Sequence, residues 1–166
     1  DVMRRVVVVV IVLTALVMVG PGAIALAGLM MVGNPAADTS CGPGGAAVTP
    51  TGEAPASIAG YSGSQLENAA AIMRAGLALE VGLHGQRVAV MTAMGESSLI
   101  NVNYGDAVGP DSRGLFQQRD NGAWGSYEDR MDPYTAATNF YRALLKVDDW
   151  EVLPPTVAAH RTQRNA

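Results

Sequence analysis

Apolar residues are distributed very unevenly along this 166-residue chain. The first long apolar stretch, Val6 to Val32, holds 27 residues without a charge. A helix of about 20 apolar residues is long enough to span the hydrocarbon core of a bilayer. Arg4-Arg5 precedes the stretch and the next basic residue is Arg74, so the positive-inside rule places the N-terminus in the cytoplasm. The pattern predicts one transmembrane helix within residues 1–33, with the rest of the chain outside the cell membrane.

A cleavable signal peptide is the alternative interpretation of the same stretch. Ala25-Leu26-Ala27 fits the small-residue site at which signal peptides are cut. We favour a retained anchor, because Leu29 to Val32 prolongs the apolar run beyond that site. Both interpretations export the remainder of the chain, as a single-pass membrane protein or as a secreted one.

Residues 34–63 are rich in Gly, Pro, Ala, Ser and Thr and show no apolar periodicity. This composition is typical of a flexible, disordered linker. The globular domain is therefore expected over residues 64–166.

Two helices are expected at the start of this domain. Ser64-Gln65-Leu66-Glu67 has the sequence of a capping box, and apolar residues follow at helical spacing up to a stop at Gly82 or Gly85. These apolar positions are Leu66, Ala70, Met73, Leu77 and Val81. A second helix, residues 86–97, is apolar on nearly all faces and should be buried.

The second half of the domain alternates loops with two further helices. Residues 100–114 carry loop signals and residues 121–130 are irregular. Asp132-Pro133 begins a third helix, with Asp as N-cap and Pro in the first turn. Its expected inner face is Ala136, Ala137, Phe140, Tyr141, Leu144 and Leu145. A short last helix starts at Pro154-Pro155-Thr156, and with no period-two segment the domain is expected to be all-α.

Composition excludes several classes of function. The net charge is −4 and no basic cluster exists beyond Arg4-Arg5, so we expect no nucleic-acid partner. The single cysteine, Cys41, excludes an internal disulfide. His84 and His160 lie far apart without ligands at metal-site spacing, so neither a metal nor another cofactor is expected.

Glu96 is the exception in the apolar second helix. It lies three residues after Ala93 and seven after Ala89, so its side chain is expected to have restricted access to water. A desolvated carboxyl group tends to stay protonated and can then protonate a glycosidic oxygen as a general acid. The alternative is structural: Glu96 caps the helix end or pairs with Arg113.

Several short motifs follow Glu96 in a specific order. They are Glu96-Ser97-Ser98-Leu99, Gly105-Asp106, Ser112-Arg113-Gly114-Leu115-Phe116-Gln117-Gln118-Arg119, Trp124-Gly125, and Asp132-Pro133 with Ala136-Ala137 and Phe140-Tyr141. This set resembles the lysozyme-like superfamily, in particular lytic transglycosylases and goose-type lysozymes. It is most similar to domains of actinobacterial membrane-anchored cell-wall and conjugation proteins, which carry Glu-Ser-Gly-Leu at the first motif. The resemblance covers residues 66–164.

The resemblance implies an enzyme that cuts peptidoglycan glycan strands between MurNAc and GlcNAc. Glu96 matches the catalytic acid, and Ser97 matches the position that orients the acid or the substrate. Gly114, Leu115 and Gln117 match the motif that lines the sugar groove.

Other residues are assigned to substrate binding by their chemistry. Gln117 and Gln118 can hydrogen-bond N-acetyl groups, and Tyr104 and Trp124 can stack on sugar faces, although Trp124 equally suits packing under a loop. The tyrosine that assists catalysis in many transglycosylases has no certain counterpart. Tyr141 is a candidate, as is Tyr134.

The number of carboxylates distinguishes two mechanisms. A hydrolase needs two, whereas a lytic transglycosylase uses one Glu as acid and then as base, because the muramyl C6 hydroxyl is the nucleophile. Asp106 and Asp111 could serve as the second group, but their Gly- and Pro-rich surroundings favour turn roles. The expectation is therefore a transglycosylase, with a lysozyme-type hydrolase as the alternative.

Three matters stay open at the level of sequence. The pathway is conjugation, secretion or wall remodelling, with envelope-complex proteins as further partners. A non-catalytic module that binds peptidoglycan or scaffolds such a complex is a second class of function. Relatives often continue into a peptidase domain, so the chain can also be the front part of a longer enzyme.

Overall fold

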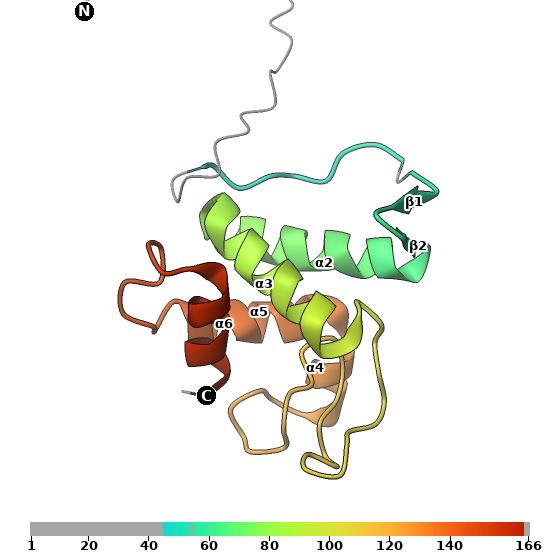
Figure 1. Cartoon of the computed structure of the whole chain (residues 1–166), viewed down its shortest axis with the longest axis vertical. Coiled ribbons are helices and arrows are strands. Elements are labelled where there is room, and N and C mark those ends of the chain that lie inside the picture. Colours follow the sequence, from blue (N-terminus) through green and yellow to red (C-terminus); the bar gives the residue numbers. More distant parts are fainter. Residues whose placement is uncertain (1–44, 54, 165–166) are drawn as a thin grey trace, which may run out of the picture. The chain divides into compact units, whose positions relative to one another are not determined.

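A computed structural model describes residues 45–53 and 55–164 of the chain. The predicted transmembrane stretch lies outside these residues. None of the helices within them has the length and apolarity that a bilayer crossing requires. The elements are β1 (Ser57–Ile58), β2 (Tyr61–Ser62), α2 (Ser64–Ala78), α3 (Gly82–Ser97), α4 (Tyr127–Met131), α5 (Pro133–Leu144) and α6 (Pro155–Arg164). Helices carry the fold, as predicted, beside one antiparallel hairpin of two-residue strands (Figure 1).

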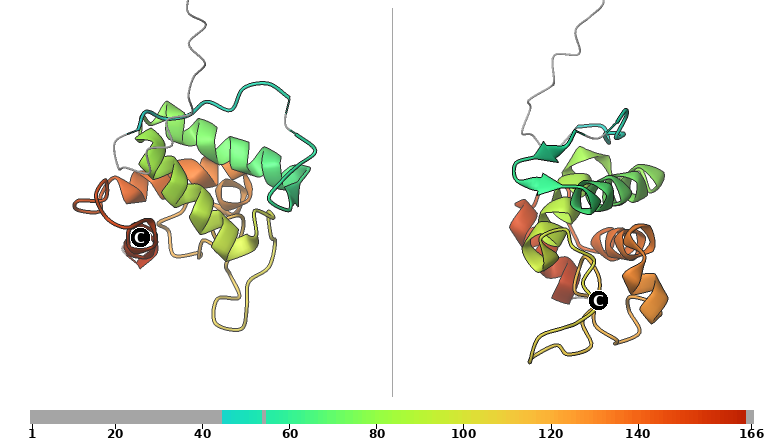
Figure 2. Two further views of the ribbon diagram at one scale, coloured as in Figure 1. Left: turned by 45° about the horizontal axis from the view of Figure 1, so that its top comes forward. Right: turned by 90° about the vertical axis from the view of Figure 1, so that its right-hand side faces the viewer.

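The core lies where α2, α3 and α5 meet, and α6 packs against α3 and α5 (Figure 2). Its largest fully buried side chains include Tyr141, Phe116, Phe140 and Ile72. The rings of Phe116 and Phe140 stack with centroids 4.8 Å apart. Phe116 belongs to the loop between α3 and α4, so this contact fixes the loop to the helices.

Helix α5 follows its predicted pattern. The Asp132 side chain accepts a hydrogen bond from the Thr135 amide at 2.8 Å, and Pro133 is the first helical residue. The predicted inner-face positions 136, 137, 140, 141 and 144 are all buried. Leu145 is the exception, because it forms the C-cap and is about half exposed.

Helix α2 begins where it was predicted to begin, but not for the predicted reason. No capping box forms at Ser64: the N-cap is Gly63, whose carbonyl accepts hydrogen bonds from the amides of Leu66 and Glu67. The buried face also differs from the expected one and consists of Ala71, Ile72, Ala75 and Gly76. Small residues allow α2 to approach α5 closely enough for the Tyr141 hydroxyl to donate to the Ile72 carbonyl at 3.2 Å.

Helix α3 starts at Gly82, earlier than predicted, and is not buried on all sides. Its buried residues are His84, Gly85, Gln86, Val88, Ala89, Thr92 and Ala93. The opposite face is open, and Met94 is 37% exposed. Apolar residues occur on nearly all faces of this sequence, so it did not show which face packs. The positions of α2, α5 and α6 decide it.

Two residues of the predicted linker, residues 34–63, form hydrogen bonds with helix α3. The Gln86 side chain accepts from the Val48 amide at 2.7 Å and donates to the Val48 carbonyl at 2.8 Å. The Leu83 amide donates to the Gly45 carbonyl at 2.8 Å. A buried side-chain amide thus pairs with extended backbone from a segment that has no apolar pattern of its own.

A short helix, α4, lies in the stretch that was predicted to be irregular. Ser126 and Asp129 form a capping box at its start, with hydrogen bonds of 3.2 Å and 2.8 Å. The helix holds five residues, too few for an apolar periodicity to be visible.

Candidate functional site

The candidate site is built at the C-terminal end of α3, where Glu96 and Ser97 occupy the last helical turn. The Ser97 hydroxyl lies 3.0 Å from the Ala93 carbonyl and 2.9 Å from the Leu115 carbonyl. The second of these hydrogen bonds joins the helix end to the Gly114–Gln118 turn. Ser97 therefore positions the motif beside Glu96.

The chain leaves α3 through two residues in the left-handed conformation. Ser98 has φ 53° and Leu99 has φ 61°, a region that residues with a side chain seldom adopt. Side-chain amides of α2 hold both carbonyls: Gln65 donates to Ser98 and Asn68 to Leu99, each at 2.8 Å. The sharp turn at the end of the helix is thus fixed from a neighbouring element.

The motif after the loop forms a tight turn closed by its own backbone. Arg113 and Gln118 exchange two backbone hydrogen bonds, of 3.0 and 3.1 Å. Gly114 has φ 75°, and a side chain at this position would collide with the Arg130 carbonyl oxygen. Only glycine fits here, which explains why the turn needs Gly114.

Together these elements form the walls of a pocket of about 270 Å³ that is open to solvent. Its lining residues are Gly95, Glu96, Ser97, Ser98, Ile100, Val102, Tyr104 and Gln117. Four of the predicted site residues, at positions 96, 97, 104 and 117, therefore meet in one place. Tyr104 is 72% exposed, so its ring is available to a ligand.

Glu96 is exposed at this pocket, which corrects the expectation that its side chain has restricted access to water. Residue 96 lies on the side of α3 that faces away from the core. Glu96 makes no ion pair with any described residue. Arg113, its predicted alternative partner, instead donates to the carbonyls of Pro110 and Ser112 at 2.8 and 2.7 Å.

Among the described residues that line the pocket, Glu96 is the only carboxylate. Asp106 accepts hydrogen bonds from the amides of Gly109 and Val108 at 2.6 and 2.9 Å, and these bonds lower the pKa of its carboxyl group. Asp111 accepts from the Asp120 amide at 2.7 Å and from Arg119, which lowers its pKa as well. Both carboxylates hold the loop together, as their turn-rich surroundings indicated.

A buried arginine organises the rest of the loop. Arg130 is 3% exposed and donates to the carbonyls of Ser126, Asp111 and Gln118 at 3.2, 3.1 and 3.4 Å. It also pairs with Asp120 at 3.2 Å. One side chain thereby connects the loop to α4.

The structure places the other predicted binding residues away from the pocket surface. Leu115 and Gln118 are buried, and Gln118 donates to the Ala136 carbonyl at 3.1 Å. Trp124 is buried under the loop, which matches the packing alternative. Tyr141 lies in the core, where burial raises the pKa of its phenol. These four residues, with Gly114, support the site from below and do not face a ligand in this structure.

Sequence reasoning missed several residues of the site. Gln65 and Asn68 lie three residues apart on α2, a spacing that puts both amides on one face. Ile100 and Val102 line the pocket from a loop without any periodicity. In the described residues no three His, Cys, Asp or Glu side chains converge in a way that could hold a metal ion.

A scan of family models and a search of curated proteins each found no match to this chain. The residues of the motifs and the geometry of the pocket are therefore the features that bear on function.

Proposed function

We propose that this domain cleaves peptidoglycan glycan strands between MurNAc and GlcNAc as a lytic transglycosylase. The observation that carries the proposal is the open pocket at the end of α3, where Glu96 is the single carboxylate among the lining residues that the structure describes. The order of motifs, which resembles that of the lysozyme-like superfamily, supports peptidoglycan as the substrate. The apolar stretch in residues 1–33 supports a location of the domain at the outer side of the cell membrane, where peptidoglycan lies.

In the proposed reaction Glu96 first acts as general acid. Its proton passes to the glycosidic oxygen as the bond to the muramyl anomeric carbon breaks. The C6 hydroxyl of the same sugar then attacks that carbon, and its proton returns to the Glu96 carboxylate. The products are a 1,6-anhydromuramyl end and a free hydroxyl on the leaving sugar, and no water is consumed.

The exposure of Glu96 makes the bound glycan part of the mechanism. Its carboxyl group is in contact with water in this structure. A sugar that fills the pocket would replace this water with the glycosidic oxygen that Glu96 has to protonate. Tyr104 offers a ring face for a sugar, and Gln117 offers an amide for an N-acetyl group.

Replacing Glu96 with Gln tests the proposal directly. General acid catalysis contributes about 10²- to 10⁴-fold, so Glu96→Gln should lower the release of soluble muropeptides from purified peptidoglycan by at least about 100-fold. Glu67→Gln is the matched control, because Glu67 is exposed on α2 and does not line this pocket. Equal digestion by wild type and Glu96→Gln would overturn the assignment.

Mass spectrometry of the products separates the two enzymatic mechanisms. Anhydro ends support the transglycosylase, whereas reducing ends indicate a lysozyme-type hydrolase with water as the nucleophile. In the hydrolase case the second carboxylate would have to come from outside the pocket lining.

The exposed position of Glu96 also favours a second candidate, a module that binds peptidoglycan without cutting it. Such a module would scaffold an envelope complex for conjugation or secretion. Wild-type protein that pellets with insoluble peptidoglycan but releases no muropeptides would support this candidate. Tyr104→Ala should then abolish pelleting, because the exposed ring is the main stacking surface of the pocket.

A further inference from the structure

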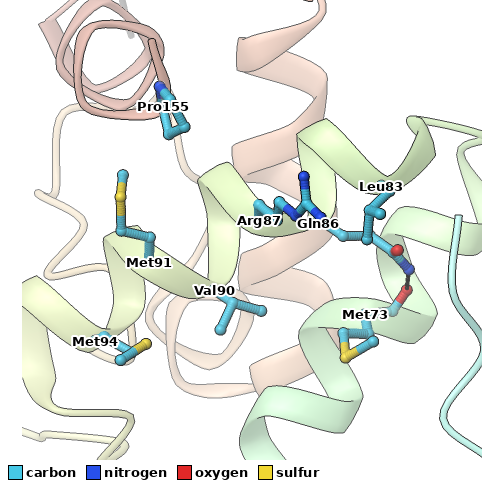
Figure 3. Close-up of a pocket in the computed structure, with 8 residues that line it drawn as sticks. All are labelled: Met73, Leu83, Gln86, Arg87, Val90, Met91, Met94 and Pro155. Atoms are coloured by element: carbon cyan, nitrogen blue, oxygen red, sulfur yellow. Dashed lines mark hydrogen bonds between the residues drawn. The ribbon is translucent and has the colours of Figure 1, made fainter. Parts of the chain in front are cut away.

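The outward face of α3 carries a second, separate pocket of about 360 Å³ (Figure 3). Its lining residues are Met73, Leu83, Gln86, Arg87, Val90, Met91, Met94 and Pro155. Positions 83, 87, 90, 91 and 94 recur at helical spacing along one face of α3. Met73 comes from α2 and Pro155 from the start of α6, and Met91 extends toward Pro155 in Figure 3. This pocket shares no lining residue with the pocket around Glu96.

The walls of this pocket are apolar and adaptable. Three of the lining residues are methionines, whose unbranched side chains reshape around apolar ligands. Gln86 offers little to a ligand, because its side-chain amide already bonds to Val48 and to the Met73 carbonyl. The walls thus suit a flexible hydrocarbon chain.

Among the described residues of the lining, Arg87 is the one that carries a charge. It is half-buried, yet it makes no ion pair or side-chain hydrogen bond with any described residue. The planar guanidinium fork matches a carboxylate in geometry and in charge. An arginine beside an apolar pocket therefore suits a ligand with an apolar chain and an anionic head.

We propose that this pocket binds a single-chain anionic amphiphile of the fatty-acid class. The alkyl tail lies along Val90, Met91 and Met94, and the carboxylate pairs with Arg87. The volume lies in the range of small-molecule sites. An amphipathic helix would instead require a long groove with a row of anchor pockets.

Photolabelling of the full chain in phosphatidylcholine nanodiscs tests this proposal. The probes are decanoate and decanol that each carry a diazirine on the alkyl chain, and labelled residues are located by mass spectrometry. The scaffold protein of the disc reports the background from probe dissolved in lipid. We expect the decanoate probe to label positions 73, 91 and 94 above this background, and unlabelled decanoate to compete.

Two arginine variants separate charge recognition from general apolar labelling. Arg87→Gln removes a charged hydrogen bond to the carboxylate, and its loss should lower affinity for the decanoate probe, and hence labelling, about tenfold. Labelling by the decanol probe should not change. Arg74→Gln is the matched control, because Arg74 is exposed on α2 outside this pocket, and it should label like wild type.

A third variant keeps the test decisive if Arg87→Gln does not fold, which circular dichroism reports. Arg87→Lys keeps the charge without the planar fork and should retain part of the selectivity for decanoate over decanol. Equal labelling of wild type by both probes, no labelling above background, or no competition by free decanoate would each overturn the proposal. Because the two pockets are separate, muropeptide release by Arg87→Gln should stay at the wild-type level.

Discussion

The helical core and the loop that follows α3 are held together by different forces. In the core, α2, α3 and α5 pack apolar side chains, and Tyr141, Phe140 and Ile72 are fully buried. In the loop, residues 99–126, hydrogen bonds from side chains to backbone groups hold the structure instead. The side chains that form them are those of Arg130, Asp106, Asp111 and Asn101. Leu99, Leu115 and Phe116 anchor the loop to the core by apolar packing.

This difference matters because the candidate site lies at the boundary of the two regions. Glu96 and Ser97 belong to a core helix, whereas Tyr104 and Gln117 belong to the loop. Apolar packing is spread over many contacts, but a loop held by a few polar groups can open when one of them is lost. We therefore expect the two halves of the pocket to respond differently to mutation and to pH.

The largest effect is expected from a substitution that breaks both regions together. Phe140→Ala removes the ring that packs on Phe116 and leaves a cavity in the core, which should lower the free energy of unfolding by about 4 kcal/mol. Urea denaturation measures this loss. Val152→Ala, at a site that is 70% exposed, should change stability by less than about 0.5 kcal/mol. A small effect of Phe140→Ala would mean that the packing of Phe116 on Phe140 does not stabilise the loop and the helical core together.

A smaller and local effect is expected at Arg130. Arg130→Met keeps an unbranched buried chain but removes the side-chain hydrogen bonds to three carbonyls and the ion pair with Asp120, at a cost of about 3 kcal/mol. Hydrogen exchange should become faster in residues 99–126 while α2 and α5 stay protected. Arg142→Met, at an exposed position of α5, is the control. Uniformly faster exchange in all helices would contradict the division into two regions.

Acid should open the loop before it unfolds the core. The pKa values of Asp106 and Asp111 are held below their usual 3.8 by backbone amides, so ionisation of both groups stabilises the folded loop. This contribution is fully present above the unfolded value and is lost as the pH falls through the lowered folded values.

The amide resonances of Val108, Gly109 and Asp120 should report this opening below about pH 4. In Asp106→Asn the transition at Val108 and Gly109 should disappear, whereas the one at Asp120 should remain. Simultaneous loss of the α5 resonances would show that the loop has no separate acid transition.

The smallest effect is expected at the turn that joins the two regions. Ser98 holds φ 53° and ψ 35°, which glycine adopts without steric cost, so Ser98→Gly should stabilise the protein by about 0.5 kcal/mol. Arg74→Gly, in an exposed stretch of α2, should instead destabilise it by about 0.8 kcal/mol. Thermal unfolding measures both changes. Destabilisation by Ser98→Gly would mean that the serine side chain contributes to the turn.

The residue pattern alone was sufficient to predict the helical class and much of α5 and α6. Asp132-Pro133 is a local start signal, and positions 136, 137, 140, 141 and 144 form one face at helical spacing. These features depend on residues close together in the chain. Of the motif at residues 114–118, which was predicted to line the sugar groove, only Gln117 lines the pocket.

Only the tertiary structure decided which face of α3 is buried, how residues 45–48 pack against Gln86, and that Arg130 holds the loop. It likewise placed Glu96 at an exposed position and Tyr141 in the core. Each of these depends on contacts between residues far apart in sequence, and a helix with apolar residues on nearly all faces gives no sign of its inner face. Local patterns determine the elements, whereas the packing of those elements decides which side chains meet a ligand.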